Sequence, residues 1–276
     1  KSIGQFLLDN AITIVLLLLV AVFVYNDPSF LSLVNLTNIL SQASTNVIIA
    51  LGVAGLIVTQ GTDLSAGRMV GLSAVVAASL LQSPDNVSRM YQHLPGILAN
   101  QYIIVALIVA CIITAFLGFL NGFVIAKLKV TPFITTLGSM IIIYGLSSMY
   151  VDREPMGAQP IGGLATHYTE FAQGGFRIGS LMVPYLVIYA TAVTIFMWIL
   201  WNKTRFGKNL FAVGGNPEAA AVSGVNITKT LLIVYTLAGA LYGFAGTLEA
   251  ARVGSATNNT GNMYELDAIA ACVVGG

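Results

Sequence analysis

Residues 102–126 form an apolar run without a single charged side chain, and this run most constrains what the chain can fold into. A helix of about 20 apolar residues crosses the hydrocarbon core of a bilayer. The composition agrees, since 57% of the residues are apolar and only 8% are charged, against about 25% charged residues in soluble domains. The sequence therefore predicts an all-α polytopic membrane protein with a single transmembrane domain over residues 1–276.

Similar runs along the chain predict the individual spans. Polar segments separate about eight apolar runs, at residues 11–25, 46–60, 69–82, 102–126, 131–150, 184–201, 230–249 and from 265 onward. Residues 29–45 mix apolar and polar side chains, and two interpretations stay open for them. They form either an interfacial helix or an inner helix with a polar face.

The placement of lysine and arginine predicts the orientation, because these residues are enriched in cytoplasmic loops. With the first residue inside, eight of them fall in inner segments: Lys1, Arg68, Lys127, Lys129, Lys203, Arg205, Lys208 and Lys229. Four fall in outer segments: Arg89, Arg153, Arg177 and Arg252. We therefore expect a cytoplasmic N-terminus, a cytoplasmic loop at 202–229 and outer loops at 83–101 and 151–183.

The loop at 202–229 contains the pattern of a short, capped helix. Asn216 is a good N-cap, Pro217 suits the first helical position, and Glu218 in the first turn is favoured by the helix dipole. Residues 219–221 are alanines, which are strong helix formers, and Gly224 suits the left-handed position after the helix end. A helix of about two turns is marginal alone in water, so we expect a partner to hold it.

Residues 61–67, Gly-Thr-Asp-Leu-Ser-Ala-Gly, interrupt the apolar sequence between two spans. The sequence leaves two interpretations of Asp63 open. A charge at membrane depth is costly and often functional, and irregular backbone is tolerated there only inside protein or along a cavity. Alternatively, the segment is a tight cytoplasmic turn in which Asp63 is hydrated.

Two other pairs of charged residues have structural interpretations. Glu249 and Arg252 are three residues apart near the outer end of a span, which favours an ion pair at helical spacing. Glu265 and Asp267 open the last apolar run, where the start of a helix favours negative charge.

Small and aromatic residues in the spans are expected to serve packing first. Gly118-x-x-x-Gly122 and Gly239-x-x-x-Gly243 have the spacing that permits close helix approach. Four aromatic residues could stack on a sugar ring, although aromatics at helical spacing are more often core residues: Phe133, Tyr144, Tyr235 and Tyr242.

No catalytic, metal or nucleotide-binding pattern is present in the sequence. It contains no G-x-x-x-x-G-K-[ST] phosphate loop and no nucleophile elbow, and clustered histidines or cysteines that would indicate a membrane-embedded enzyme are missing. A net charge of +1 gives no footprint for nucleic acid. If ATP drives this protein, the ATPase is another chain. The alternative is an ion-coupled secondary transporter, which needs ionisable groups at mid-membrane, and only Asp63 is a candidate.

Several motifs resemble one family. Glu218-Ala219-Ala220-x-x-x-Gly224 is similar to the E-A-A-x-x-x-G signature of permease subunits of ATP-binding-cassette importers. The segments 61–67, 131–138 and 265–276 are similar to segments of the monosaccharide branch of that family, which includes ribose permeases. Residues 202–209 and 254–259 resemble the galactose-type permeases of enteric bacteria in particular. The resemblance covers nearly the whole chain, but the family chain continues through further spans, which implies about ten spans in the native protein.

The resemblance implies a function and a set of partners. The chain would pair with a second permease copy in the bacterial inner membrane, and an ATP-binding-cassette ATPase carrying ATP and Mg would bind each short helix. A periplasmic sugar-binding protein would deliver galactose, methyl galactoside or a related monosaccharide. Coupling is expected from Asn216, Pro217, Glu218, Ala219, Ala220 and Gly224, with Arg205 and Lys208 adding charged contacts or only fixing orientation. Candidate residues of the sugar pathway are Asp63, Ser65, Phe133, Glu265 and Asp267.

Overall fold

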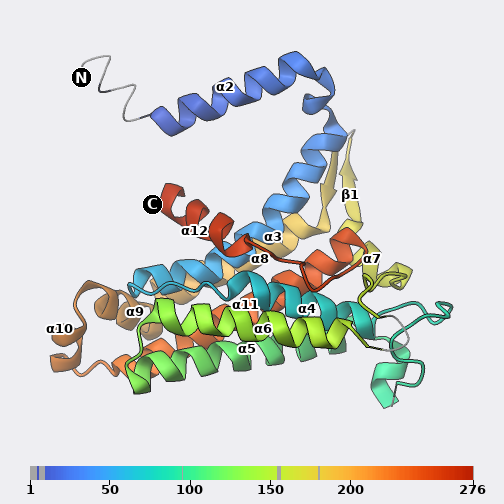
Figure 1. The fold of residues 1–276 in the computed structure, drawn as a ribbon. Helices are drawn as coiled ribbons and strands as arrows, with labels where there is room; N and C mark the ends of the chain where they lie inside the picture. Colours follow the sequence, from blue (N-terminus) through green and yellow to red (C-terminus); the bar gives the residue numbers. More distant parts are fainter. Residues whose placement is uncertain (1–4, 6–9, 95, 154–156, 180, 276) are drawn as a thin grey trace.

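The computed structural model describes residues 5, 10–94, 96–153, 157–179 and 181–275. Most of the long helices lie side by side in one bundle, while α2 lies apart from it (Figure 1). Each predicted apolar run contains one helix, and these helices are α2 (Ala11–Asn26), α3 (Leu33–Val58), α4 (Ala66–Leu80), α5 (Ile103–Leu128), α6 (Pro132–Val151), α8 (Tyr185–Lys203), α11 (Ile227–Val253) and α12 (Tyr264–Gly275).

Helix length divides these helices into two groups. Among the described residues, five helices are long and apolar enough to cross a membrane: α3, α5, α6, α8 and α11. The helices α2 and α4 are apolar but shorter, and α12 has 12 residues. The all-α polytopic class is therefore confirmed, whereas the predicted number of eight spans is not established by helix length.

The mixed segment 29–45 is not a separate interfacial helix, because most of it belongs to α3. Its hydroxyl side chains bond to the carbonyl oxygens of their own helix. Thr37 donates to Leu33 at 2.8 Å, and Ser41 donates to Thr37 at 2.9 Å. Such bonds satisfy hydroxyl groups without breaking a helix. The polar residues therefore leave the helix continuous, and it begins well before the predicted span.

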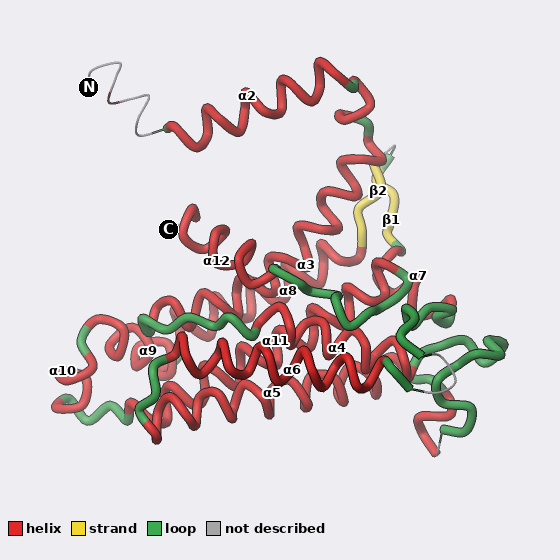
Figure 2. Tube along the Cα trace, in the orientation of Figure 1, coloured by secondary structure: helices red, strands yellow, loops and turns green. Residues whose placement is uncertain are grey.

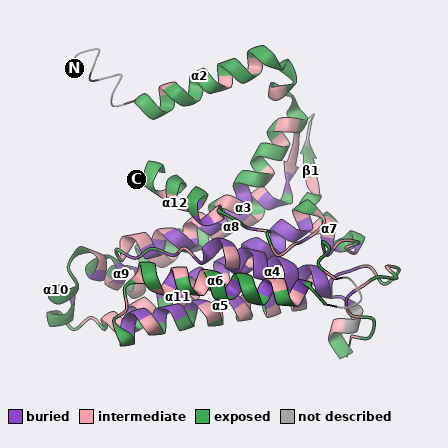
Figure 3. Ribbon diagram, viewed as in Figure 1, coloured by how far each residue is buried: buried purple, intermediate pink, exposed green. Residues whose placement is uncertain are grey.

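Helix α11 lies at the centre of the bundle, between α3, α4 and α5, and carries much of the buried surface (Figure 3). Glycines permit this close packing. A Cβ atom on Gly239 would overlap the carbonyl of Thr114, and one on Gly118 would overlap the carbonyl of Tyr235. The two predicted glycine pairs thus pack α5 against α11, as expected for small residues in membrane helices. By contrast, α2 has no buried residue.

Short elements occupy the two opposite ends of the bundle (Figure 2). One end carries segments 83–101 and 151–183, which contain more structure than the predicted loops: η2 (Gly96–Asn100), α7 (Thr166–Gln173) and the antiparallel hairpin β1 (Gly175–Ile178) and β2 (Leu181–Pro184). Near this end η1 (Pro28–Leu31) links α2 to α3. The other end carries α9 (Arg205–Gly215) and α10 (Pro217–Val222). We call these the loop end and the α10 end.

Candidate functional site

The short helix predicted in segment 202–229 is α10, and its first turn is capped as expected. The Asn216 side-chain oxygen accepts a hydrogen bond from the backbone N–H of Ala219 at 3.0 Å. Pro217 occupies the first helical position and Glu218 lies in the first turn. The helix ends at Val222. Local sequence chemistry is therefore sufficient to define where this helix begins.

The end of α10 is closed by a glycine in the left-handed conformation. Gly224 has a φ of +83°. Its N–H donates to Ala221 O at 3.0 Å, and the N–H of Val225 donates to Ala220 O at 3.0 Å. These two bonds form a Schellman motif, which satisfies carbonyl groups that a helix end otherwise leaves free.

One side of α10 is covered by the protein and the other is open. Ala220 is buried, whereas the apolar side chain of Val222 is 92% exposed. Glu218 and Ala219 are also exposed. An isolated helix of this length has little stability of its own. The exposed side of α10 is thus a small surface with an apolar residue available to a partner.

Helix α9 supports α10, and the sequence reasoning missed it. Thr204 caps it by accepting the N–H of Gly207 at 3.3 Å, and Leu210 and Val213 are buried. A capping threonine and an apolar spacing of three residues were the available signals. Arg205 and Lys208 lie on this helix and are exposed.

The supporting helix α9 is fixed to the end of α3. Gly214 lies so close that a Cβ atom on it would overlap the carbonyl of Val58. The Gln60 side chain donates to the Gly214 carbonyl at 2.8 Å. Gln60 has a φ of +59°, and the N–H of Gly61 bonds Leu56 O at 2.9 Å. The chain therefore turns sharply at Gln60, which is in contact with α9 through Gly214.

Asp63 lies inside the protein, so its interpretation as a hydrated turn residue is wrong. It is 1% exposed and accepts hydrogen bonds from Ser65 N at 2.9 Å and from Ser65 Oγ at 2.5 Å. Asn121 on α5 donates to Ser65 Oγ at 3.0 Å and accepts from Ser139 on α6. Segment 61–65 is non-helical, and its residues Gly61, Asp63 and Ser65 are buried in protein, where irregular backbone is tolerated in membranes.

A second non-helical segment, 254–263, approaches the first from the loop end. It begins where Gly254 ends α11 with a φ of +80°, and Ala256 pairs with Ile161 through backbone bonds of 2.8 and 3.1 Å. A Cβ atom on Gly67 would overlap the Gly261 carbonyl, and one on Gly71 would overlap the Thr260 carbonyl. Segment 254–263 therefore lies directly on α4, and the glycines of α4 permit this approach.

The five candidate pathway residues do not form one site. Asp63 and Ser65 are joined by hydrogen bonds, and Glu265 lies next to them, with its carboxylate against Gly67 and 8% of the residue exposed. Asp267 is exposed on α12, and Phe133 is 56% exposed on α6. The structure thus brings together three candidates and places the other two elsewhere.

The charge count expects Arg68 in an inner segment, and the structure places it in the first turn of α4. There its guanidinium donates to Asn262 Oδ1 at 2.6 Å and to Asn259 Oδ1 at 3.4 Å. Its guanidinium carbon is 4.4 Å from the centre of the Tyr144 ring. No local pattern could have indicated these contacts, because they join α4 and α6 to a segment near the end of the chain.

The predicted pair of Glu249 and Arg252 is confirmed, within a larger network. Arg252 donates to both carboxylate oxygens of Glu249, at 2.9 and 2.7 Å. Tyr264 Oη donates to Glu249 at 2.8 Å, and Thr45 Oγ1 donates at 3.1 Å. Glu249 is 1% exposed, so these contacts balance its buried charge and tie α11 to α3 and α12.

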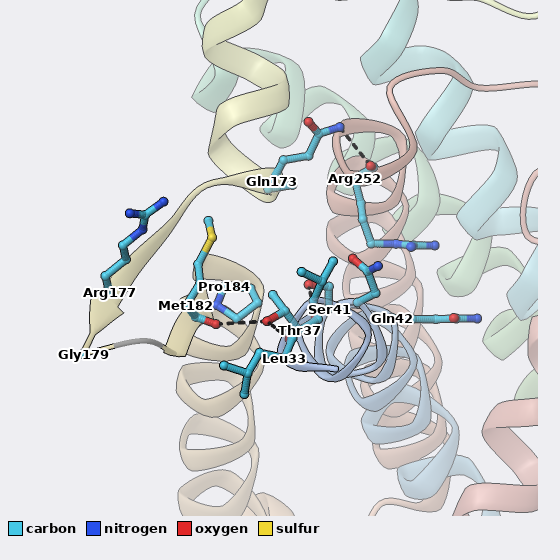
Figure 4. A pocket seen from close by; sticks show the side chains of 13 residues that line it. Leu33, Thr37, Ser41, Gln42, Gln173, Arg177, Gly179, Met182, Pro184 and Arg252 are labelled. Carbon is cyan, nitrogen blue, oxygen red and sulfur yellow. Dashed lines mark hydrogen bonds between the residues drawn. The ribbon is translucent and has the colours of Figure 1, made fainter. Parts of the chain in front are cut away.

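A cavity of about 650 Å³ opens beside this network, between the first half of α3, α7 and the β-hairpin (Figure 4). Thr37, Ser41 and Gln42 line it from α3, and Arg177 and Arg252 add positive charge. The Thr37 hydroxyl reaches Met182 O at 3.4 Å across its wall. Cavities of roughly 300–1,000 Å³ accommodate small ligands. Polar side chains of α3 and the arginines of β1 and α11 thus form part of its wall.

A bundle of apolar helices, with a polar cavity near one end and a capped, exposed helix at the other, is the architecture of a membrane permease. The chain belongs to the family described as the permease component of the branched-chain amino acid transport system, which it matches over residues 35–276. It is therefore a multi-pass membrane component of a transport system, and not a catalytic subunit.

Individual relatives include sugar permeases. The chain is 57% identical to the galactose/methyl galactoside import permease protein MglC of Escherichia coli K12, over the whole chain and 80% of the relative. It is 37% identical to the ribose import permease protein RbsC of the same strain, over 98% of the chain and 78% of the relative. The MglC of Treponema pallidum is 35% identical, over 99% of the chain and 53% of the relative. No solved structure matches the chain.

Proposed function

We propose that this chain is the membrane-spanning permease subunit of an ATP-driven importer that carries galactose or methyl galactoside into the bacterial cytoplasm. Identity of 57% over the whole chain and 80% of a galactose/methyl galactoside import permease is the observation that supports this substrate. The exposed helix α10, which is capped at both ends, supports the ATP-driven mechanism. A helix this short is marginal in water on its own, and a partner ATPase would bind its exposed side. ATP and Mg belong to that partner ATPase, and this chain holds no cofactor.

The coupling contact in this proposal is the exposed side of α10. Glu218 and Val222 meet the ATPase, while Asn216 and Gly224 keep the helix formed. The exposed residues Arg205 and Lys208 on α9 either contact the ATPase or fix the orientation of the chain. Helix α9 then transmits ATPase movement to α3, on which it is tightly packed.

The orientation follows from the distribution of cationic residues. With the first residue inside, eight lysines and arginines fall in inner segments and four in outer segments. This bias places the N-terminus and the α10 end in the cytoplasm and the loop end in the periplasm. A periplasmic sugar-binding protein docks at the loop end, where Arg177 and Arg252 line the cavity. A second copy of the chain completes the pathway.

The buried Asp63 favours one alternative, an ion-coupled secondary transporter, because carboxylates enclosed at membrane depth often relay protons. Reconstitution distinguishes the two functions. The chain is placed in proteoliposomes with the ATPase and the galactose-binding protein, and uptake of radiolabelled galactose is measured with and without ATP and a protonophore. ATP-dependent uptake that persists with the protonophore supports the importer. Uptake that needs a proton gradient and no ATP refutes it.

A further inference from the structure

Arg68, Tyr144, Asn259 and Asn262 form a group that we call the Arg68 cluster. Two segments that are distant in sequence meet there, the beginning of α4 and the non-helical segment 254–263. The guanidinium of Arg68 is held by the two asparagine side chains, at 2.6 and 3.4 Å, and lies 4.4 Å from the centre of the Tyr144 ring. The orientation of its remaining donors is therefore fixed before any ligand arrives.

The Arg68 cluster lies far from both ends of the bundle. Tyr144 is on α6, about 18 Å from the beginning of that helix at Pro132 and about 10 Å from its end at Val151, at about 1.5 Å per residue. The hydrocarbon core of a bilayer is about 30 Å thick. In a membrane-spanning permease, the Arg68 cluster is thus at the depth of the hydrocarbon core.

The Arg68 cluster is also accessible from outside the chain. Asn259 and Asn262 are exposed, and Tyr144 is 41% exposed. A half-buried arginine and two exposed amides are costly in contact with lipid, and ionisable groups at this depth face a water-filled space or another protein surface. The surrounding α6 face is apolar, with Ile141 64% exposed and Leu146 48% exposed.

The chemistry of the Arg68 cluster suits a neutral ligand rich in hydroxyl groups. Arginine has five N–H donors and each asparagine offers an amide donor and acceptor. Glu265 lies close enough to attract Arg68 electrostatically, and its buried Oε2 has no hydrogen-bond partner among the described residues. The two asparagine amides are uncharged and both donate and accept hydrogen bonds, which matches the hydroxyl groups of a sugar. The Tyr144 ring adds an apolar face for a sugar ring.

We propose that Arg68, Tyr144, Asn259 and Asn262 are a monosaccharide contact site midway along the translocation path. Hydroxyl groups of the passing sugar exchange hydrogen bonds with the two asparagines and Arg68, and the apolar side of the ring passes over Tyr144. The site is linked to the buried Asp63 segment through the backbone between residues 63 and 68. This assignment rests on the proposed import function.

The test uses the full complex in proteoliposomes, with the ATPase and the galactose-binding protein. Uptake of galactose and of methyl galactoside is measured for wild type, Asn262→Ala, Tyr144→Leu and the control Ile141→Ala, which alters the same exposed face without a polar group. A sugar contact shifts the ratio of galactose to methyl galactoside uptake about fivefold, the size of one net hydrogen bond. ATP hydrolysis without sugar stays at the wild-type rate, and Ile141→Ala keeps the wild-type ratio.

The outcomes separate the two proposals. Wild-type complex that takes up neither sugar with ATP refutes the import function. If the wild type transports both sugars and the cluster variants keep the wild-type ratio, the contact site is refuted and the import function stands. If the variants instead lower both uptakes equally and dissociate into single permease chains on light scattering, the cluster is an interface between two copies, which also overturns the sugar site.

Discussion

Replacing Gly224 by alanine tests the coupling role of α10 through the backbone alone. Gly224 has a φ of +83°, and a Cβ atom there would meet nothing within 4 Å. Steric overlap therefore contributes nothing. The free-energy cost is that of holding an alanine in the left-handed backbone conformation, about 1–2 kcal/mol. This free-energy cost lowers the ratio of molecules with the Schellman motif formed to those without it about 5- to 30-fold.

We expect most of this change to appear in transport, because a helix as short as α10 has no reserve of stability. ATP-dependent galactose uptake by the reconstituted complex should fall several-fold, while the amount of permease in the membrane stays constant. ATP hydrolysis by the isolated ATPase is unaffected, since that chain is unchanged. Binding of the ATPase to the permease, measured by sedimentation of proteoliposomes, should weaken in parallel.

Two variants serve as controls for Gly224→Ala. Gly215→Ala adds the same methyl group to the last residue of α9, where space is also open and φ is not left-handed, so uptake should stay near wild type. Gly224→Asn retains much of the uptake, because asparagine tolerates the left-handed conformation. Equal uptake by Gly224→Ala and Gly215→Ala would refute the reasoning, since the Schellman closure would then be irrelevant to coupling.

Three further changes test other parts of the structure. Gly246→Ala should lower the stability in detergent by about 1–3 kcal/mol, seen as a lower Tm, because its Cβ would overlap Ser73 Oγ and overpacking is costly; an unchanged Tm would contradict the packing of α11 on α4. Glu249→Gln should cost about 2 kcal/mol by weakening charged hydrogen bonds to Arg252, and a thermal melt that matches wild type would contradict this. Asn216→Ala removes an N-cap worth about 1 kcal/mol, so uptake should fall at constant expression, and full uptake would show the cap to be dispensable.

Local chemistry made part of this structure predictable. The apolar runs located the eight helices, and Asn216 and Gly224 defined the ends of α10, because capping depends on residues within one turn. Helix α9 was missed although Leu210 and Val213 carry its apolar spacing, since a polar, basic stretch masks a short amphipathic helix.

The contacts of Asp63 and Arg68 were not predictable from the sequence, for a different reason. Whether Asp63 is buried depends on α5 and α6, which supply Asn121 and Ser139 around Ser65. The contacts of Arg68 depend on a segment 191 to 194 residues further along the chain. Hydropathy and spacing describe neighbours in sequence, and neither indicates which distant segments meet.

The sharp turn at Gln60 has a mechanical consequence. Its side chain holds α9 through Gly214, and the next residues of the same backbone pass Asp63 and reach Arg68. Only a few covalently linked residues separate the two places, and Gly61 is itself held by its bond to Leu56. A displacement of α9 must therefore either break the Gln60 bond or pull on the segment that contains Asp63. The backbone itself therefore links movement of α9 at the α10 end to the Arg68 cluster inside the bundle.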